Sequence, residues 1–128
     1  MPKPYTGGET YALTGAEILS LNDRDVVERV EVPEWGGHVL VGAMTGRDRD
    51  RFERECLEAT QADRAAPDDV RAKLAIACCI DAEGAPLFAQ SDIDAVALKS
   101  SIALDRIYEV CLRINAMSDA DIEEITEK

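Results

Sequence analysis

The stretch of sequence that decides the fold is residues 26–44, which read VVERVEVPEWGGHVLVGAM. Val30 and Val32 alternate with charged residues before a Pro-Glu-Trp-Gly-Gly cluster, and Val39 and Val41 alternate again after it. Two alternating runs joined by a short Gly-rich loop predict a β-hairpin. Because an isolated hairpin is only marginally stable in water, this one must lie on a helix or pair with another chain.

Helical patterns lie on both sides of the hairpin. Thr14 and Glu17 form a capping box for a short helix that ends near Leu21. A second short helix is predicted to begin at Ser91, which precedes two aspartates. Apolar residues also recur at helical spacing in four longer segments. These segments are residues 46–61, 69–80, 98–117 and 119–127.

Length and period together define the domain organisation. A chain of 128 residues corresponds to one domain. Residues 1–12 are rich in Pro, Gly and Thr and show no periodic pattern of apolar residues, so they are expected to form a flexible N-terminal arm. Residues 13–128 are expected to form an α+β fold, a mainly α-helical single domain with one β-hairpin. The apolar fraction of 46% is enough for a folded core.

Net charge limits the classes of partner. The chain has 14 Lys and Arg against 26 Asp and Glu, which gives a formal net charge of -12. Nucleic-acid and anionic-membrane surfaces are bound through Lys and Arg, so neither is expected as a partner. Since the N-terminus has no signal-like apolar stretch and no run reaches the ~18–20 residues of a membrane span, the expected location is the cytoplasm. The four cysteines are then expected to be reduced thiols.

Residues that could carry chemistry are few. Cys56, Cys78 and Cys111 lie on apolar helical stripes and Cys78 is adjacent to Cys79, a pattern typical of buried small hydrophobes rather than of a metal site. His38 is the single histidine, and nothing in the sequence places a nucleophile beside it. Paired acids two residues apart on a helix do not face one another. We therefore expect no catalytic, cofactor-binding or metal-binding residues, and an interaction protein rather than an enzyme.

Two places in the sequence are expected to face partners. Trp35, at the tip of the predicted hairpin, either folds back onto the core or anchors a partner, because tryptophan is enriched at binding hot spots. The last helix, 119–127, is strongly acidic and has only Ile122 and Ile125 as apolar residues besides Ala120. Trp35, Ile122 and Ile125 are therefore the candidate partner-binding residues.

The order of these elements resembles the tail assembly chaperones of long-tailed bacteriophages and prophages. The resemblance covers residues 13–127 and includes the LTGAEIL helix start, the Trp-Gly-Gly hairpin and the MTGRDRDRFE segment. Its most characteristic part is the Asp-x-x-Gly-x-Pro-Leu-Phe segment at 81–88, followed by a long helix.

The resemblance implies a non-enzymatic role in tail morphogenesis. Such proteins coat the long helical tape measure protein, keep it in solution, help recruit tail tube protein, and are absent from the mature virion. They act in the host cytoplasm, and many families also make a longer form by ribosomal frameshifting. Self-association is left open. The alternative is an acidic decoy that occupies a basic, nucleic-acid-binding site on a host protein, although arginines are interleaved with the acids at 47–55.

Overall fold

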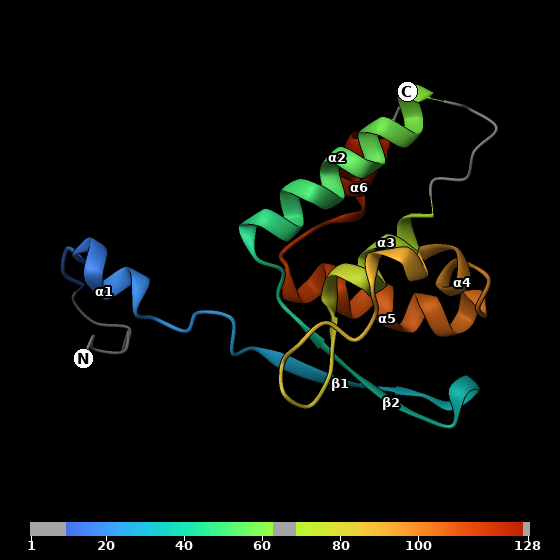
Figure 1. Ribbon diagram of the computed structural model, residues 1–128, viewed down its shortest axis with the longest axis horizontal. Coiled ribbons are helices and arrows are strands. Elements are labelled where there is room, and N and C mark those ends of the chain that lie inside the picture. The colour runs from blue at the N-terminus through green and yellow to red at the C-terminus, as the bar shows by residue number, and fades with distance from the viewer. Residues whose placement is uncertain (1–9, 63–68, 127–128) are drawn as a thin grey trace.

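The computed structural model describes residues 10–62 and 69–126 (Figure 1). Residues 1–9 of the expected arm lie outside the described part. The elements, in chain order, are α1 (Gly15–Leu19), β1 (Val27–Val32), a 3-10 turn η1 (Pro33–Trp35), β2 (Gly37–Gly42), α2 (Gly46–Ala62), α3 (Val70–Cys78), β3 (Cys79–Ile80), a second 3-10 turn η2 (Gln90–Asp92), α4 (Ile93–Ala97), α5 (Ser101–Ile114) and α6 (Asp119–Thr126). This confirms a mainly helical α+β fold with a β-hairpin.

The predicted hairpin is confirmed, and it has a third strand. β1 pairs antiparallel with β2, with Val30 opposite Val39, and β2 pairs with β3. Val30, Val32 and Val41 face inward and are buried, as the alternation predicts. Helix α5 contacts both long strands on this inner side, so the hairpin lies on a helix as its stability requires.

The end of α3 corrects the predicted helix over 69–80. The helix stops at Cys78, and Cys79 has an extended backbone with φ -75° and ψ 132°. Cys79 and Ile80 instead pair with Val41 and Leu40 of β2. Pairing with a distant strand satisfies the backbone groups that a longer helix would have satisfied. The two adjacent cysteines therefore belong to different elements.

The segment after β3 is a tight loop, as predicted. The Asp81 carboxylate accepts hydrogen bonds from the backbone N–H groups of Glu83 and Ala85, each at 2.9 Å. Gly84 has a φ of +87°, which favours glycine. Pro86 then bridges back to Ile80.

Two predicted helix boundaries in the second half are wrong. Ser91 does not cap a helix; Asp92 accepts a hydrogen bond from the Ala89 N–H at 2.8 Å, and a 3-10 turn precedes α4. The long helix predicted from about residue 98 begins only at Ser101, because the Ser100 hydroxyl accepts from the Ala103 N–H at 3.3 Å. A side-chain cap of this kind separates α5 from α4.

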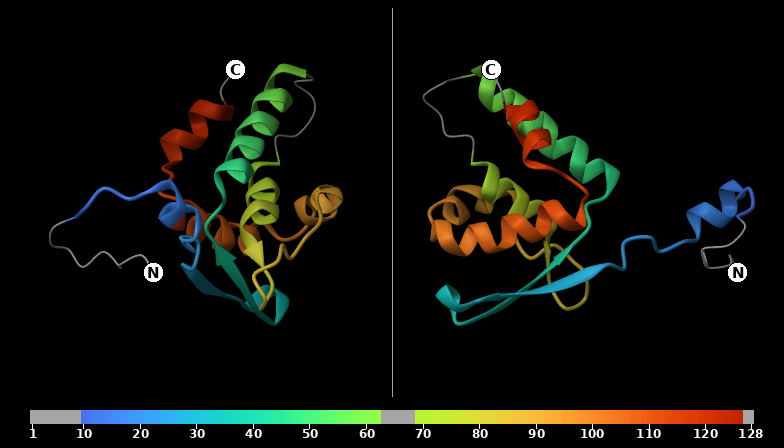
Figure 2. Two further views of the ribbon diagram at one scale, coloured as in Figure 1. Left: turned by 60° about the vertical axis from the view of Figure 1, so that its left-hand side comes forward. Right: turned by 180° about the vertical axis from the view of Figure 1, so that it is seen from behind.

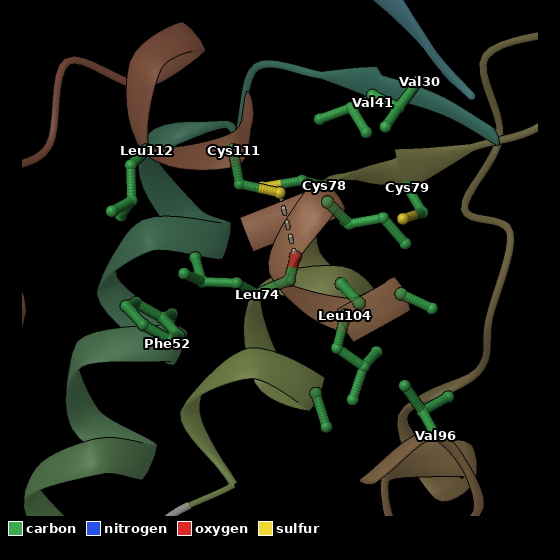
Figure 3. Close-up of a cluster of buried hydrophobic side chains, with 14 of the residues drawn as sticks. Val30, Val41, Phe52, Leu74, Cys78, Cys79, Val96, Leu104, Cys111 and Leu112 are labelled. Atoms are coloured by element: carbon green, nitrogen blue, oxygen red, sulfur yellow. Dashed lines mark hydrogen bonds between the residues drawn. The ribbon is translucent and has the colours of Figure 1, made fainter. Parts of the chain in front are cut away.

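The core lies between the inner face of the sheet and the helices. It joins α2, α3, α5 and the hairpin through buried apolar side chains, among them Phe52, Leu74 and Cys111 (Figure 3). All four cysteines are buried. The Cys111 thiol donates to the Leu74 carbonyl at 3.9 Å. Within residues 10–62 and 69–126, the structure contains no helix long and apolar enough to cross a membrane.

Helix α1 stands away from this core (Figures 1 and 2). Its capping box is present as predicted, because Thr14 accepts from the Glu17 N–H at 3.2 Å and Glu17 accepts from the Thr14 N–H at 2.9 Å. The helix is thus specified locally, and residues 20–26 lead from it into β1.

Candidate partner-binding groove

The tip of the hairpin presents Trp35. Pro33 begins the 3-10 turn, and Gly36 ends it with a φ of +74° that a residue with a Cβ adopts only with strain. Glu34 accepts two hydrogen bonds from the Arg106 guanidinium of α5, each at 2.9 Å. This pair fastens the tip to the helix layer, and the hydrogen bond from Arg106 lowers the pKa of Glu34.

An apolar groove opens beside Trp35, between the hairpin tip and α4. Its volume is about 340 Å³. Trp35 is 38% exposed, and Val96 forms part of the floor with only 5% exposed. The complete lining is Trp35, Phe88, Asp92, Ala95, Val96 and Lys99. The groove is therefore built from two parts of the chain that are distant in sequence, the hairpin tip and residues 88–99.

Exposed aliphatic side chains flank the groove. Leu98, 87% exposed, directly precedes the lining residue Lys99. Ile102, 61% exposed, lies one turn before Arg106 on α5, so it shares the helix face that holds the hairpin tip. The groove has an aromatic wall and aliphatic neighbours, and its lining carries one acid and one base. A surface of this kind can bury apolar side chains of a partner. The lining supplies no paired nucleophile and base.

A second hollow of about 330 Å³ lies between α2, α3 and the segment 86–93, with Phe88 common to both hollows. Four charged residues, Asp48, Arg51, Glu55 and Lys73, belong to its lining. Arg51 and Asp48 form an ion pair at 3.7 Å, and the Lys73 ammonium donates to the Glu55 carbonyl at 3.5 Å. Because these groups pair with one another, the groove at Trp35 is the better surface for an apolar partner.

The candidate residues of the last helix lie in a different place from Trp35. Ser118 and Asp121 cap α6 reciprocally, as the Ser118 hydroxyl accepts from the Asp121 N–H and the Asp121 carboxylate accepts from the Ser118 N–H. Ile122 is 7% exposed, and Ile125 packs against the core; α6 contacts α2. Partner binding through Ile122 and Ile125 stays a prediction, and it requires α6 to separate from α2.

The thiols and the imidazole lie on opposite faces of the sheet. Cys79 pairs with Val41 on the buried side. His38 is exposed and pairs with Glu31, in register with the outward-facing Leu40. The geometry does not bring these groups together. Among the described residues, no group of three or more His, Cys, Asp or Glu could hold a metal ion.

Burial makes Cys79 sensitive to high pH. Desolvation, aided by neighbouring Cys78, raises the pKa of Cys79 from 9.0 to about 12. Because the folded pKa is above the unfolded one, the stability contributed by the neutral thiol is complete below pH 9 and is lost as the pH rises toward 12.

We therefore expect the free energy of unfolding to fall more steeply between pH 9 and pH 11 in the native chain than in Cys79→Ala. Urea denaturation followed by circular dichroism at several pH values measures both slopes, and comparison with the variant removes the contribution of other titrating groups. Equal slopes would contradict the prediction.

Comparison with known proteins supports the fold. No protein-family model and no curated protein matches the sequence. Among solved structures, the tail assembly chaperone of bacteriophage HK97 matches with a TM-score of 0.56 and 19% sequence identity, covering 78% of this chain and 89% of that one. The chain therefore shares the fold of a phage tail assembly chaperone, and the resemblance stated from the sequence is confirmed at the level of the fold.

Proposed function

We propose that this chain is a non-enzymatic tail assembly chaperone that binds the tape measure protein of its phage or prophage and helps recruit tail tube protein. It acts in the host cytoplasm and is absent from the mature virion. The shared fold supports the assignment. The observation that carries the site is the open apolar groove beside Trp35, which offers a surface for apolar side chains of a helical client.

The chemistry of the client explains why such a groove is useful. A long helical protein that waits for assembly exposes apolar stripes, which are an aggregation hazard. An amphipathic helix is recognised by laying its apolar face into a hydrophobic groove. A net charge of -12 on each bound copy would keep the complex dispersed. Binding through a shallow groove is also reversible, as later release of the client requires.

The acidic decoy is supported less well by the surface. A mimic of nucleic acid needs unpaired acids in a row, whereas many acids here are neutralised by arginines. Ion pairs join Arg29 to Glu31, Arg49 to Glu53, Arg51 to Asp48, Arg71 to Asp105, Arg106 to Glu34 and Arg113 to Glu28. These pairs lie on both the sheet and the helices and place an arginine beside six of the 26 acids, which interrupts the negative surface.

Co-expression tests the proposal. The tape measure protein of the same phage or prophage should remain in the supernatant when it is produced with this chain and sediment when it is produced alone. An unrelated acidic protein of similar size, produced at the same level, controls for charge and expression. A client that sediments equally in all three cultures would contradict the chaperone role, and recovery of a host DNA-binding enzyme on the tagged chain would favour the decoy.

A further inference from the structure

Residues 10–26, which extend beyond the arm expected over residues 1–12 and are called the arm from here on, concentrate apolar side chains in solvent. Of the twelve large hydrophobic residues that are exposed in the described part of the chain, seven fall between residues 11 and 27. They are Tyr11, Leu13, Ile18, Leu19, Leu21, Val26 and Val27. None of the five residues of α1, all of them described, is buried. A helix this short is marginal in isolation, so an apolar face on it is useful only against a partner.

The arm continues into the outer face of the sheet. Val27 of β1, Leu40 of β2 and Ile80 of β3 point to this side, opposite to the buried valines. The absence of a Cβ on Gly42 matters here, since the Cδ1 atom of Ile80 lies only 3.3 Å from where that Cβ would be. Helices α3 and α5 lie on the other side of the hairpin (Figures 1 and 2).

A shallow hollow of about 440 Å³ joins the arm to this face. Its lining contains Val27, Leu40 and Ile80 from the sheet together with Asn22, Arg24 and Asp25 from the arm. The hollow thus links residues 22–25 of the arm to the outer face, and α1 precedes these residues in the chain. The groove at Trp35 is a separate site, because it lies at the opposite end of β1. The six residues of this strand span ~20 Å.

The charges around the hollow select the partner. Its lining includes three acids, Asp25, Asp81 and Glu83, against one base, Arg24. The arm adds Glu17 and Asp23. A ligand that matches this surface has an apolar stripe for the floor and positive charges for the rim.

We propose that the arm and the outer face of the sheet form a second docking surface, which takes an amphipathic helix whose apolar stripe is flanked by Lys or Arg. This rests on the proposed function, in that the natural ligand is a helix of the client protein. A second copy of this chain matches the surface less well, because both copies would carry a net charge of -12. The two docking surfaces would hold one rod-like client at two points and raise the avidity for it.

Designed peptides test the chemistry separately from the client. The probe is a fluorescent helix of about 18 residues, ~27 Å long, with a leucine stripe and lysine on the remaining positions. A peptide with glutamate in place of every lysine, and a lysine peptide with scrambled leucines, are the ligand controls. Fluorescence anisotropy with the full chain should show saturable binding of the leucine/lysine helix only, weakened by added salt.

Variants locate the binding surface. Ile18→Ser with Leu19→Ser should weaken binding by about tenfold or more, since two apolar contacts are lost from residues that the fold does not bury. Leu57→Ser is the matched control, because Leu57 is 48% exposed on α2 and lines neither hollow; it should bind like the native chain. Asp25→Asn with Glu83→Gln should reduce both the affinity and its salt dependence.

Each outcome decides the proposal. Unchanged binding by the arm and charge variants, or equal binding of the glutamate peptide, would overturn it. Loss of binding in Trp35→Ala would assign the peptide to the other groove and overturn it as well, while leaving the proposed function intact. Self-association that sedimentation detects in the native chain, and that Ile18→Ser with Leu19→Ser abolishes, would give the arm to a second copy instead. If only the co-expression test fails, the proposed client is wrong and the docking surface still stands.

Discussion

Replacing Phe52 with alanine is expected to destabilise the protein by about 3–5 kcal/mol, the range for removing a fully buried aromatic ring. Phe52 is 1% exposed on α2 and projects toward Leu74 of α3 (Figure 3). Because α6 also lies on α2, the ring belongs to the helix that supports two others. Its removal leaves a cavity that backbone elements held by the sheet cannot easily close.

Thermal unfolding followed by circular dichroism measures this effect. The midpoint should fall by roughly 10–20 °C in a domain of this size. Leu98→Ala is the matched control, since Leu98 is 87% exposed and surface substitutions change stability by about 0.5 kcal/mol or less. Equal midpoints for the two variants would mean that Phe52 does not pack as the structure places it.

Trp35→Ala is expected to weaken binding of the client by about 30-fold, which corresponds to ~2 kcal/mol for a hot-spot aromatic. The indole forms one wall of the groove, and Phe88 and Val96 complete the apolar lining. Trp35 lies in the turn η1 and outside the core cluster, so its removal should cost the fold far less than the removal of Phe52. The loss should therefore appear mainly in binding, with a much smaller fall of the unfolding midpoint than Phe52→Ala causes.

Isothermal titration with a helical segment of the tape measure protein measures the affinity. Leu57→Ala provides the control, because Leu57 is 48% exposed on α2 and does not line the groove. Equal affinities for the native chain and Trp35→Ala would place the client elsewhere on the molecule.

Local signals in the sequence predicted most of the elements. The alternation on both sides of Trp35 predicted the hairpin, and Thr14 accepts a backbone hydrogen bond at the start of α1, as its position predicted. Thr45 and Ser118 accept equivalent hydrogen bonds at the starts of α2 and α6. Each cap depends on residues three positions apart, and the hairpin on an alternation within nineteen residues. Signals of this short range can be recognised in a single sequence.

Features that depend on distant segments were missed. Cys79 and Ile80 continue an apolar helical stripe in sequence, yet they join the sheet because β2 offers unpaired backbone groups. The groove at Trp35 also needs Phe88 and Val96, more than fifty positions away. Only Trp35 itself could be predicted for the site, since a large aromatic in a turn is a local signal. The lining residues that are distant from Trp35 in the chain belong to no sequence motif that would have identified them as part of the groove.

The place of α6 shows the same limit. Two isoleucines three residues apart suggested a stripe for a partner, but in the structure Ile122 is buried and Ile125 packs on the core. A stripe of two residues fits either an intramolecular or an intermolecular neighbour. In the structure the stripe packs inside the molecule and α6 lies on α2, which no pattern within residues 119–126 indicated. Partner binding through the two isoleucines stays a prediction.

The most direct test of the central claim, that the groove at Trp35 receives an apolar helix of the client, uses the protein's single tryptophan. A tape measure segment without tryptophan is titrated into the chain while the emission of Trp35 and its quenching by acrylamide are recorded. We expect a saturable shift of the emission to shorter wavelength and reduced quenching, because the indole loses water on binding. Complex formation seen by sedimentation with unchanged Trp35 emission and quenching would contradict the account.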